Sequence, residues 1–168
     1  MKNPVLYNSL NLPKVVKIVD FKPSYQNAFR SLNEEWISKY FEMEEADFKV
    51  LDHPQEYILD KGGYIAIALL DNEPVGTCAL MKMHNGQFDY ELAKMGVSPK
   101  AQGMGVGYQL AENVIQKAKE LGATNIFLES NTILKPAIQL YKKLGFKEID
   151  HIKTPYKRCN IQMELKLK

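Results

Sequence analysis

Three glycines at alternate positions, Gly103, Gly105 and Gly107, lie within MGVSPKAQGMGVGYQL, residues 95–110, between a short apolar stretch and a helix-like pattern. Glycine lets the backbone approach a ligand closely. The free N–H groups in the first turn of a helix form an anion site, which the helix dipole strengthens. The segment therefore predicts a loop that binds phosphate groups.

Two familiar phosphate-binding motifs do not fit this segment. A Walker A loop needs Lys and then Ser or Thr after its last glycine, whereas Val106 and Gly107 follow Gly105. A dinucleotide fingerprint needs its glycines at the first crossover of a parallel sheet. The strand expected before Gly103 is instead the third strand of an antiparallel meander. The sequence therefore supports neither nucleotide hydrolysis nor NAD binding.

The segment resembles the pyrophosphate loop of the GNAT superfamily of acyl-CoA-dependent N-acyltransferases, in which Q/R-x-x-G-x-G/A follows a strand. Gln102, Gly105 and Gly107 match this pattern. A second match is AIQLYKKLGF, residues 137–146, which is similar to the superfamily signature A-x-x-L-Y-x-x-x-G-F. The order of expected strands and helices is also similar, so the resemblance covers roughly residues 14–165.

The resemblance implies that acetyl-CoA is the acyl donor, bound as a substrate. The strand end at residues 95–97 would pair with the pantetheine arm at a bulge and direct a backbone N–H at the thioester carbonyl. Leu134 stands where the superfamily often has an asparagine near the cysteamine end, and Asn131 is a candidate replacement. The cofactor-binding residues that the resemblance implies are Met95, Gly96, Val97, Gln102, Gly103, Met104, Gly105, Val106, Gly107, Tyr108 and Asn131.

Two side chains match catalytic positions of the superfamily. Tyr141 matches the tyrosine that donates a proton to the departing thiolate, and a phenol with a pKa of about 10 is protonated at neutral pH. Glu91 lies six residues before Val97, like the glutamate that takes the amine proton through water in the histone-acetylating branch. The alternatives are a core tyrosine and a solvated strand carboxylate. Neither Cys78 nor Cys159 matches a nucleophile position, which favours direct transfer over a covalent acyl-enzyme.

The resemblance implies that the first helix and its loop shape the acceptor pocket. Glu35, Trp36 and Tyr40 could receive a cationic amine through their charge and aromatic faces. Alternatively, Glu35 belongs to the exposed face of an amphipathic helix. Arg158, near the last strand, either binds a carboxylate of the acceptor or forms a salt bridge within the protein.

The elements that must position these residues follow from the hydrophobic pattern. The order βααβββαβαββ predicts an α/β (α+β) GNAT acyltransferase fold, with a mixed, mostly antiparallel sheet of about six or seven strands flanked by about four helices. Spacings of three and four predict helices within residues 23–41, 44–63, 106–121 and 136–145. Alternating or β-branched stretches predict strands at residues 14–21, 64–70, 75–83, 87–97, 124–130, 147–153 and 159–167.

Length and composition narrow the class of protein. The 168 residues fit a single domain, residues 1–168, that begins with an N-terminal tail at residues 1–12. Lys and Arg number 22 against 20 Asp and Glu, so we expect no nucleic-acid partner. Two distant cysteines and scattered histidines predict neither a disulfide nor a metal site and indicate a cytoplasmic protein. The longest apolar run, residues 64–70, is too short to cross a membrane.

The sequence therefore predicts an N-acetyltransferase that moves an acetyl group from acetyl-CoA to a primary amine by direct attack in a ternary complex. The acceptor would be a small-molecule amine or a protein amino group. The alternative is a non-catalytic module of the same fold that binds and senses acyl-CoA, which the missing asparagine at Leu134 leaves open. The terminal strands could pair across a homodimer.

Overall fold

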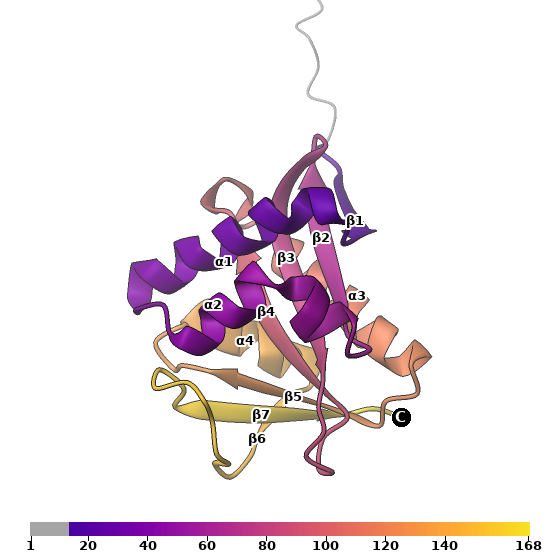
Figure 1. The fold of residues 1–168 in the computed structure, drawn as a ribbon, viewed down its shortest axis with the longest axis vertical. Helices are drawn as coiled ribbons and strands as arrows, with labels where there is room; N and C mark the ends of the chain where they lie inside the picture. The colour runs from indigo at the N-terminus through magenta and orange to yellow at the C-terminus, as the bar shows by residue number, and fades with distance from the viewer. Residues whose placement is uncertain (1–13) are drawn as a thin grey trace, which may run out of the picture.

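The computed structural model describes residues 14–168, so the tail expected at residues 1–12 lies outside the described residues. The described chain forms a seven-stranded sheet in the order β1-β2-β3-β4-β5-β7-β6, with helices on both faces (Figure 1). Its strands are β1 (Val16–Asp20), β2 (Tyr64–Leu70), β3 (Glu73–Lys82), β4 (Tyr90–Val97), β5 (Asn125–Ser130), β6 (Lys147–Glu148) and β7 (Ile161–Lys166). Its α-helices are α1 (Gln26–Tyr40), α2 (Glu45–Asp52), α3 (Val106–Glu120) and α4 (Lys135–Leu144).

Three short helical turns complete the list of elements. They are the 3₁₀ turns η1 (Pro23–Tyr25) and η3 (Pro99–Ala101) and the π-helical turn η2 (Gln55–Leu59). The predicted element order and mixed, mostly antiparallel sheet are confirmed. The strand predicted at residues 147–153 is wrong in length, because only Lys147 and Glu148 pair with β7. The rest of that segment enters a loop, in which Ile152 is held by the side chain of Gln162.

Two helical layers bury the two faces of the sheet. Helices α1 and α2 lie in front of the strands in Figure 1, and α3 and α4 lie behind them. The front core joins Phe29 and Leu51 to the strand residue Ile65. The rear core joins Leu110 of α3 to Leu80 of β3. Successive side chains along a strand therefore point to opposite faces of the sheet. One set packs against the front helices and the other against the rear helices.

The sheet opens between its two central strands. The parallel pairing of β4 with β5 consists of two residue pairs, Tyr90 with Ile126 and Glu91 with Phe127. The remaining residues of β4, up to Val97, are not paired with β5, whereas β5 stays paired with β7 along its length. Glu91 therefore lies where the two strands separate, and the β4 backbone beyond it has a free edge.

A β-bulge distorts β4 just beyond this separation. Thr77 pairs with Gly96 and Ala79 pairs with Ala93, so β4 contains one more residue than β3 between these pairs. Lys94 within the bulge has a left-handed backbone, with φ of 51°. The bulge expected at residues 95–97 is therefore present, but its strained residue precedes that segment.

Candidate active site

A cavity of about 670 Å³ extends from the opening between β4 and β5 to the start of α3. Its walls come from α1, β4, the loop before α3, the end of β5 and α4. Met104, which was expected to bind the cofactor, is absent from these walls because its side chain packs against the rear core. The other predicted cofactor-binding residues all line the cavity, namely Met95, Gly96, Val97, Gln102, Gly103, Gly105, Val106, Gly107, Tyr108 and Asn131.

The loop before α3 ends in a row of free backbone donors. Gly103 and Gly105 have left-handed backbones, with φ of 79° and 74°, which turn the chain into the helix. Within the described chain, the first α3 N–H to donate to a backbone carbonyl is that of Gln109, which lies 3.1 Å from Gly105 O. The N–H groups of residues 106–108 precede it and form the positive end of the helix dipole. No acidic residue lies in this first turn to compete with an anion.

Two further glycines allow close packing around the cavity. A Cβ at Gly96 would lie 2.8 Å from Cδ1 of Trp36, so the glycine lets α1 approach β4. A Cβ at Gly107 would contact the Leu140 side chain at 3.4 Å, where α3 faces α4. The glycine inside β4 therefore serves helix packing, whereas the unusual backbone conformation belongs to Lys94.

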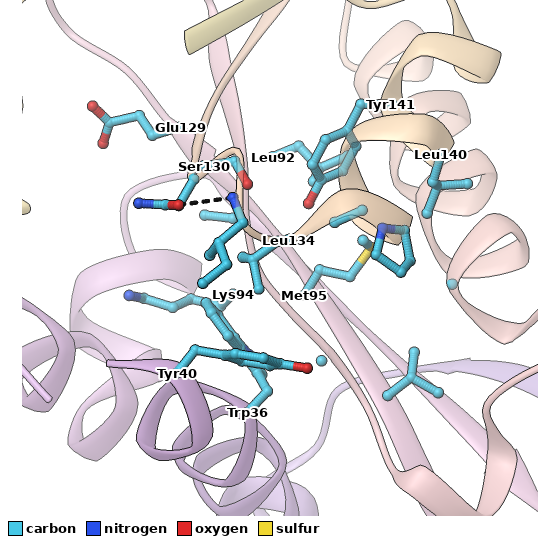
Figure 2. A pocket seen from close by; sticks show the side chains of 18 of the residues that line it. Trp36, Tyr40, Leu92, Lys94, Met95, Glu129, Ser130, Leu134, Leu140 and Tyr141 are labelled. Atoms are coloured by element: carbon cyan, nitrogen blue, oxygen red, sulfur yellow. Dashed lines mark hydrogen bonds between the residues drawn. The ribbon is translucent and has the colours of Figure 1, made fainter. Parts of the chain in front are cut away.

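Tyr141 points its hydroxyl into the cavity from α4, while Tyr40 extends into it from the side of α1 (Figure 2). The Tyr141 side chain is otherwise enclosed, and the residue is 7% exposed. Burial raises the pKa of Tyr141, with a smaller contribution from Cys78, so the phenol is a neutral hydrogen donor at physiological pH. The hydroxyl is therefore placed to give a proton to a group inside the cavity.

Glu91 lies at the floor of the opening between β4 and β5. Burial raises the pKa of its carboxyl group to about 8, and the nearby Glu129 acts in the same direction while Lys94 opposes them. Part of the residue is still accessible, and it faces the cavity. Because ionisation occurs near neutral pH, Glu91 can accept a proton and release it under physiological conditions.

The residues predicted for the acceptor separate into two groups. Trp36 and Tyr40 line the cavity, because residues four apart lie on the same face of a helix. Glu35 is exposed and is not part of the cavity wall, since it points about 100° away from Trp36 around α1. The structure therefore does not bring Glu35 into the site and agrees with the alternative of an exposed helix face.

Arg158 lines the cavity, but its guanidinium is engaged within the protein. Its two terminal nitrogens lie 2.6 Å from the two carboxylate oxygens of Asp47, and one of them lies 3.2 Å from Glu44. Lys94 joins the same carboxylate at 2.8 Å and also donates to the Tyr156 hydroxyl at 3.0 Å. The salt-bridge alternative for Arg158 is the one observed.

The sequence predicts neither Lys94, which lines the cavity, nor its buried partner Asp47, which lies outside the cavity wall. Burial alone would raise the pKa of Asp47, but hydrogen bonds from Arg158 and the charge of Lys94 outweigh it and lower the pKa to about 2. One signal could have pointed to Asp47, namely the spacing Glu44-x-x-Asp47 of a capping box at the start of α2. No local signal marks Lys94, whose partner is 47 residues away in the chain.

Asn131 contacts the protein through both ends of its side-chain amide. Its Nδ2 donates to Arg158 O at 2.7 Å, and its Oδ1 accepts from the N–H of Ile133 at 2.9 Å. The side chain thus holds the turn after β5, and Leu134 lines the cavity beyond that turn (Figure 2). A hydrogen bond between the Asn131 amide and the cofactor would have to form beside these two existing hydrogen bonds.

Two features together define the GNAT class of fold. The sheet separates between the parallel strands β4 and β5, and a glycine-rich loop leads into the helix beside this opening. The chain belongs to the acetyltransferase (GNAT) family, whose family model matches residues 26–146. The predicted superfamily membership is thereby confirmed.

Similar proteins carry related names. The uncharacterized N-acetyltransferase YjgM of Escherichia coli is 33% identical over 96 residues, which cover 55% of this chain and 58% of that protein. N-acetyltransferase 8B of Rattus norvegicus is 27% identical over 116 residues, covering 67% of this chain and 50% of the relative. The chain thus spans only about half the length of these curated relatives.

Solved structures show the same fold. A GNAT acetyltransferase of Staphylococcus aureus has a TM-score of 0.82 at 22% identity and covers 92% of this chain and 100% of its own. The yncA acetyltransferase of Salmonella typhimurium, solved with acetyl-CoA, has a TM-score of 0.72 at 16% identity, with coverages of 91% and 94%.

Residues 14–168 lack the features of two other kinds of site. No helix there has the length and apolar character needed to span a membrane. No group of three or more His, Cys, Asp and Glu side chains in the same range is arranged to hold a metal ion.

Proposed function

We propose that this protein is an N-acetyltransferase that transfers the acetyl group of acetyl-CoA directly to a primary amine. The observation that carries the proposal is a single cavity that joins the free N–H groups at the start of α3 to the Tyr141 hydroxyl and the Glu91 carboxyl. These groups match three needs of the reaction, which are an anchor for pyrophosphate, a proton donor and a proton acceptor.

The donor would bind along the opening in the sheet. Its pyrophosphate would accept hydrogen bonds from the free N–H groups of residues 106–108, and its pantetheine arm would pair with the free edge of β4 beyond Glu91. A backbone N–H at the bulge would then face the thioester carbonyl. Such a donor stabilises the oxyanion that forms when the carbonyl carbon becomes tetrahedral.

The chemistry would proceed in one ternary complex. The neutral amine attacks the carbonyl carbon, the C–S bond breaks as the oxyanion collapses, and coenzyme A leaves as a thiolate. Tyr141 gives its proton to that sulfur, and the surplus proton of the amine passes to Glu91 directly or through water.

Thiol release from acetyl-CoA with a panel of primary amines tests the proposal, with mass spectrometry of the acetylated amine as confirmation. Double-reciprocal plots should intersect, as expected for a ternary complex, and parallel lines would indicate an acyl-enzyme instead. Thermal stabilisation by acetyl-CoA provides the binding control. Stabilisation by acetyl-CoA without thiol release on any amine would identify the second candidate, a protein that senses acyl-CoA. The observation that favours this candidate is Leu134, which stands in place of the superfamily asparagine.

We further propose a cytoplasmic location, which the free thiols of Cys78 and Cys159 support. A homodimer formed through the terminal strands stays a prediction. Within the described residues β1 and β6 are the edges of the sheet, and β6 covers β7 only at Met163 and Glu164. An edge-to-edge dimer would therefore use β1, or β6 together with the part of β7 that β6 does not cover.

A further inference from the structure

A second cavity, of about 300 Å³, adjoins the first on the face of the sheet that carries α2. The two cavities share three wall residues, Glu91, Glu129 and Tyr156. Glu91 thus forms part of the boundary between the proposed acetyl-transfer cavity and the second cavity. Most of the second wall is apolar, formed chiefly by Val50, Tyr57, Met81, Met83, Phe127 and Ile152.

The far wall of the second cavity is held in place by Gln162, which is 1% exposed. The Gln162 amide donates to Ile152 O at 3.0 Å and accepts from the N–H of Ile152 at 2.7 Å. It also donates to the Glu129 carboxylate at 2.9 Å. The loop that contains Ile152 is therefore fixed to β7, which carries Gln162, and through Glu129 to β5.

The charges at the shared boundary favour a cation. Glu91 and Glu129 lie on neighbouring strands and on the same face of the sheet, opposite the rear core residues Leu92 and Leu128. The two cations nearby, Lys94 and Arg158, already share the Asp47 carboxylate. An ammonium group at the boundary would therefore meet the Glu129 carboxylate, and its positive charge would favour ionisation of Glu91.

We propose that the second cavity binds the body of the acceptor, and that the acceptor is a primary amine bearing an apolar group, without a carboxylate on the carbon that carries the amine. This inference rests on the proposed function, because it places the attacking nitrogen at Glu91. The apolar group would occupy the space between Tyr57, Met83 and Ile152. Burial of its methylene groups would supply most of the affinity.

A free α-amino acid is disfavoured by the same geometry. Its carboxylate would lie one carbon from the nitrogen and close to Glu129, and to Glu91 once that residue is ionised, and like charges in close contact weaken binding strongly. Lys49 and Lys153 also line the second cavity, but both are exposed at its mouth and Lys49 is paired with Glu45. They are therefore placed to meet the distal end of an acceptor and not the carbon beside its nitrogen.

The test uses linear alkylamines from propylamine to hexylamine, which have similar basicity and differ in apolar surface. Binding is measured by calorimetry on the full chain saturated with coenzyme A, and turnover is measured by thiol release from acetyl-CoA. Affinity should increase about three- to fourfold with each added methylene. Met83→Trp, which fills the cavity, should remove this dependence on chain length. His84→Trp, at an exposed neighbour outside both cavity walls, should retain it.

A second comparison tests the charge at the boundary. Leucinamide should bind at least about tenfold more tightly than leucine, and Glu129→Gln should reduce this preference while it keeps the hydrogen bond from Gln162. Affinity that does not vary with chain length, or equal affinity for leucine and leucinamide, would overturn the inference even if turnover is observed. Chain-length-dependent binding without thiol release would support the subsite and contradict the proposed transferase.

Discussion

Lys94 Nζ lies 2.8 Å from Asp47 Oδ1, and the two side chains are only 5% and 0% exposed. This buried ion pair ties the start of α2 to the strained bulge of β4, where Lys94 has a φ of 51°. Arg158 and the Tyr156 hydroxyl complete the cluster. A backbone conformation of this kind persists only when its surroundings enforce it, so the pair fixes the strand segment proposed to face the thioester.

Removal of the shared carboxylate should therefore be costly. We expect Asp47→Ala to lower the free energy of unfolding by about 3–5 kcal/mol, because it leaves the buried Lys94 without a carboxylate partner and Arg158 with Glu44 alone. The matched control is Glu73→Ala, which breaks an exposed pair with Lys100 and should cost less than about 1 kcal/mol. Urea denaturation measures both. Equal, small effects of the two changes would show that the buried cluster does not stabilise the fold.

The same carboxylate should make the protein sensitive to acid. The pKa of Asp47 is lowered to about 2 in the folded chain, so its stabilising effect is complete above its ordinary range near 3.8 and is lost as the pH falls through about 2. The loss should amount to about 2 kcal/mol between pH 5 and pH 2. Asp47→Asn should remove this component from the pH dependence of unfolding. A wild-type slope in that variant would contradict the assignment.

Much of this framework follows from local sequence patterns. The strand at residues 64–70 and the helix from Val106 were predicted at their observed starts, because period-two and period-3.6 patterns are local properties. Gly145, predicted to end the last helix, has the left-handed backbone of a helix end, with φ of 100°. The glycine-rich loop was found because its left-handed backbone at Gly103 and Gly105 is marked by a local residue type.

The features that were missed depend on contacts between distant residues. Lys94 in its bulge is held by Asp47, Tyr156 and the pairing with β3, which no short window of sequence contains. The second cavity likewise combines α2, β3, β4, β5 and a loop near the C-terminus. The sequence left two positions open for Glu35, the pocket and the exposed helix face, because it shows a helix but not the direction in which each face points.

The pH dependence of turnover should reflect the ionisation of the Glu91 carboxyl group. Since the pKa of Glu91 is about 8, kcat/KM should increase as the pH rises toward 8, while the carboxyl loses its proton, and this limb should level off above it. Glu91→Gln should abolish the limb and lower the rate at pH 8.5. Rates of each protein would be measured with one amine at constant ionic strength. An unchanged profile in the variant would assign the proton to water.

Acetyl-CoA binding should depend on the backbone at Gly105. Gly105 and Gly122 begin and follow the same helix with φ of 74° and 79°, and a Cβ at either would contact nothing within 4 Å. Replacement by Ala should therefore destabilise both proteins equally, by about 1–2 kcal/mol of left-handed strain. Only Gly105→Ala should also weaken acetyl-CoA binding, by about tenfold or more, in an equilibrium titration. Equal acetyl-CoA dissociation constants for the two variants would show that the loop at Gly105 does not bind acetyl-CoA.

The most direct test of acetyl transfer in this cavity is the turnover of Tyr141→Phe, followed through coenzyme A release and acetylated amine together. The account predicts that the wild-type protein forms both products in equal amounts and that the variant turns over about 100-fold more slowly with an unchanged acetyl-CoA dissociation constant. Tyr90→Phe, at a buried tyrosine of the same core outside the cavity wall, should match the wild type. Turnover of Tyr141→Phe at the wild-type rate would contradict the proposed proton donor, and thiol release without acetylated amine would contradict the transferase itself.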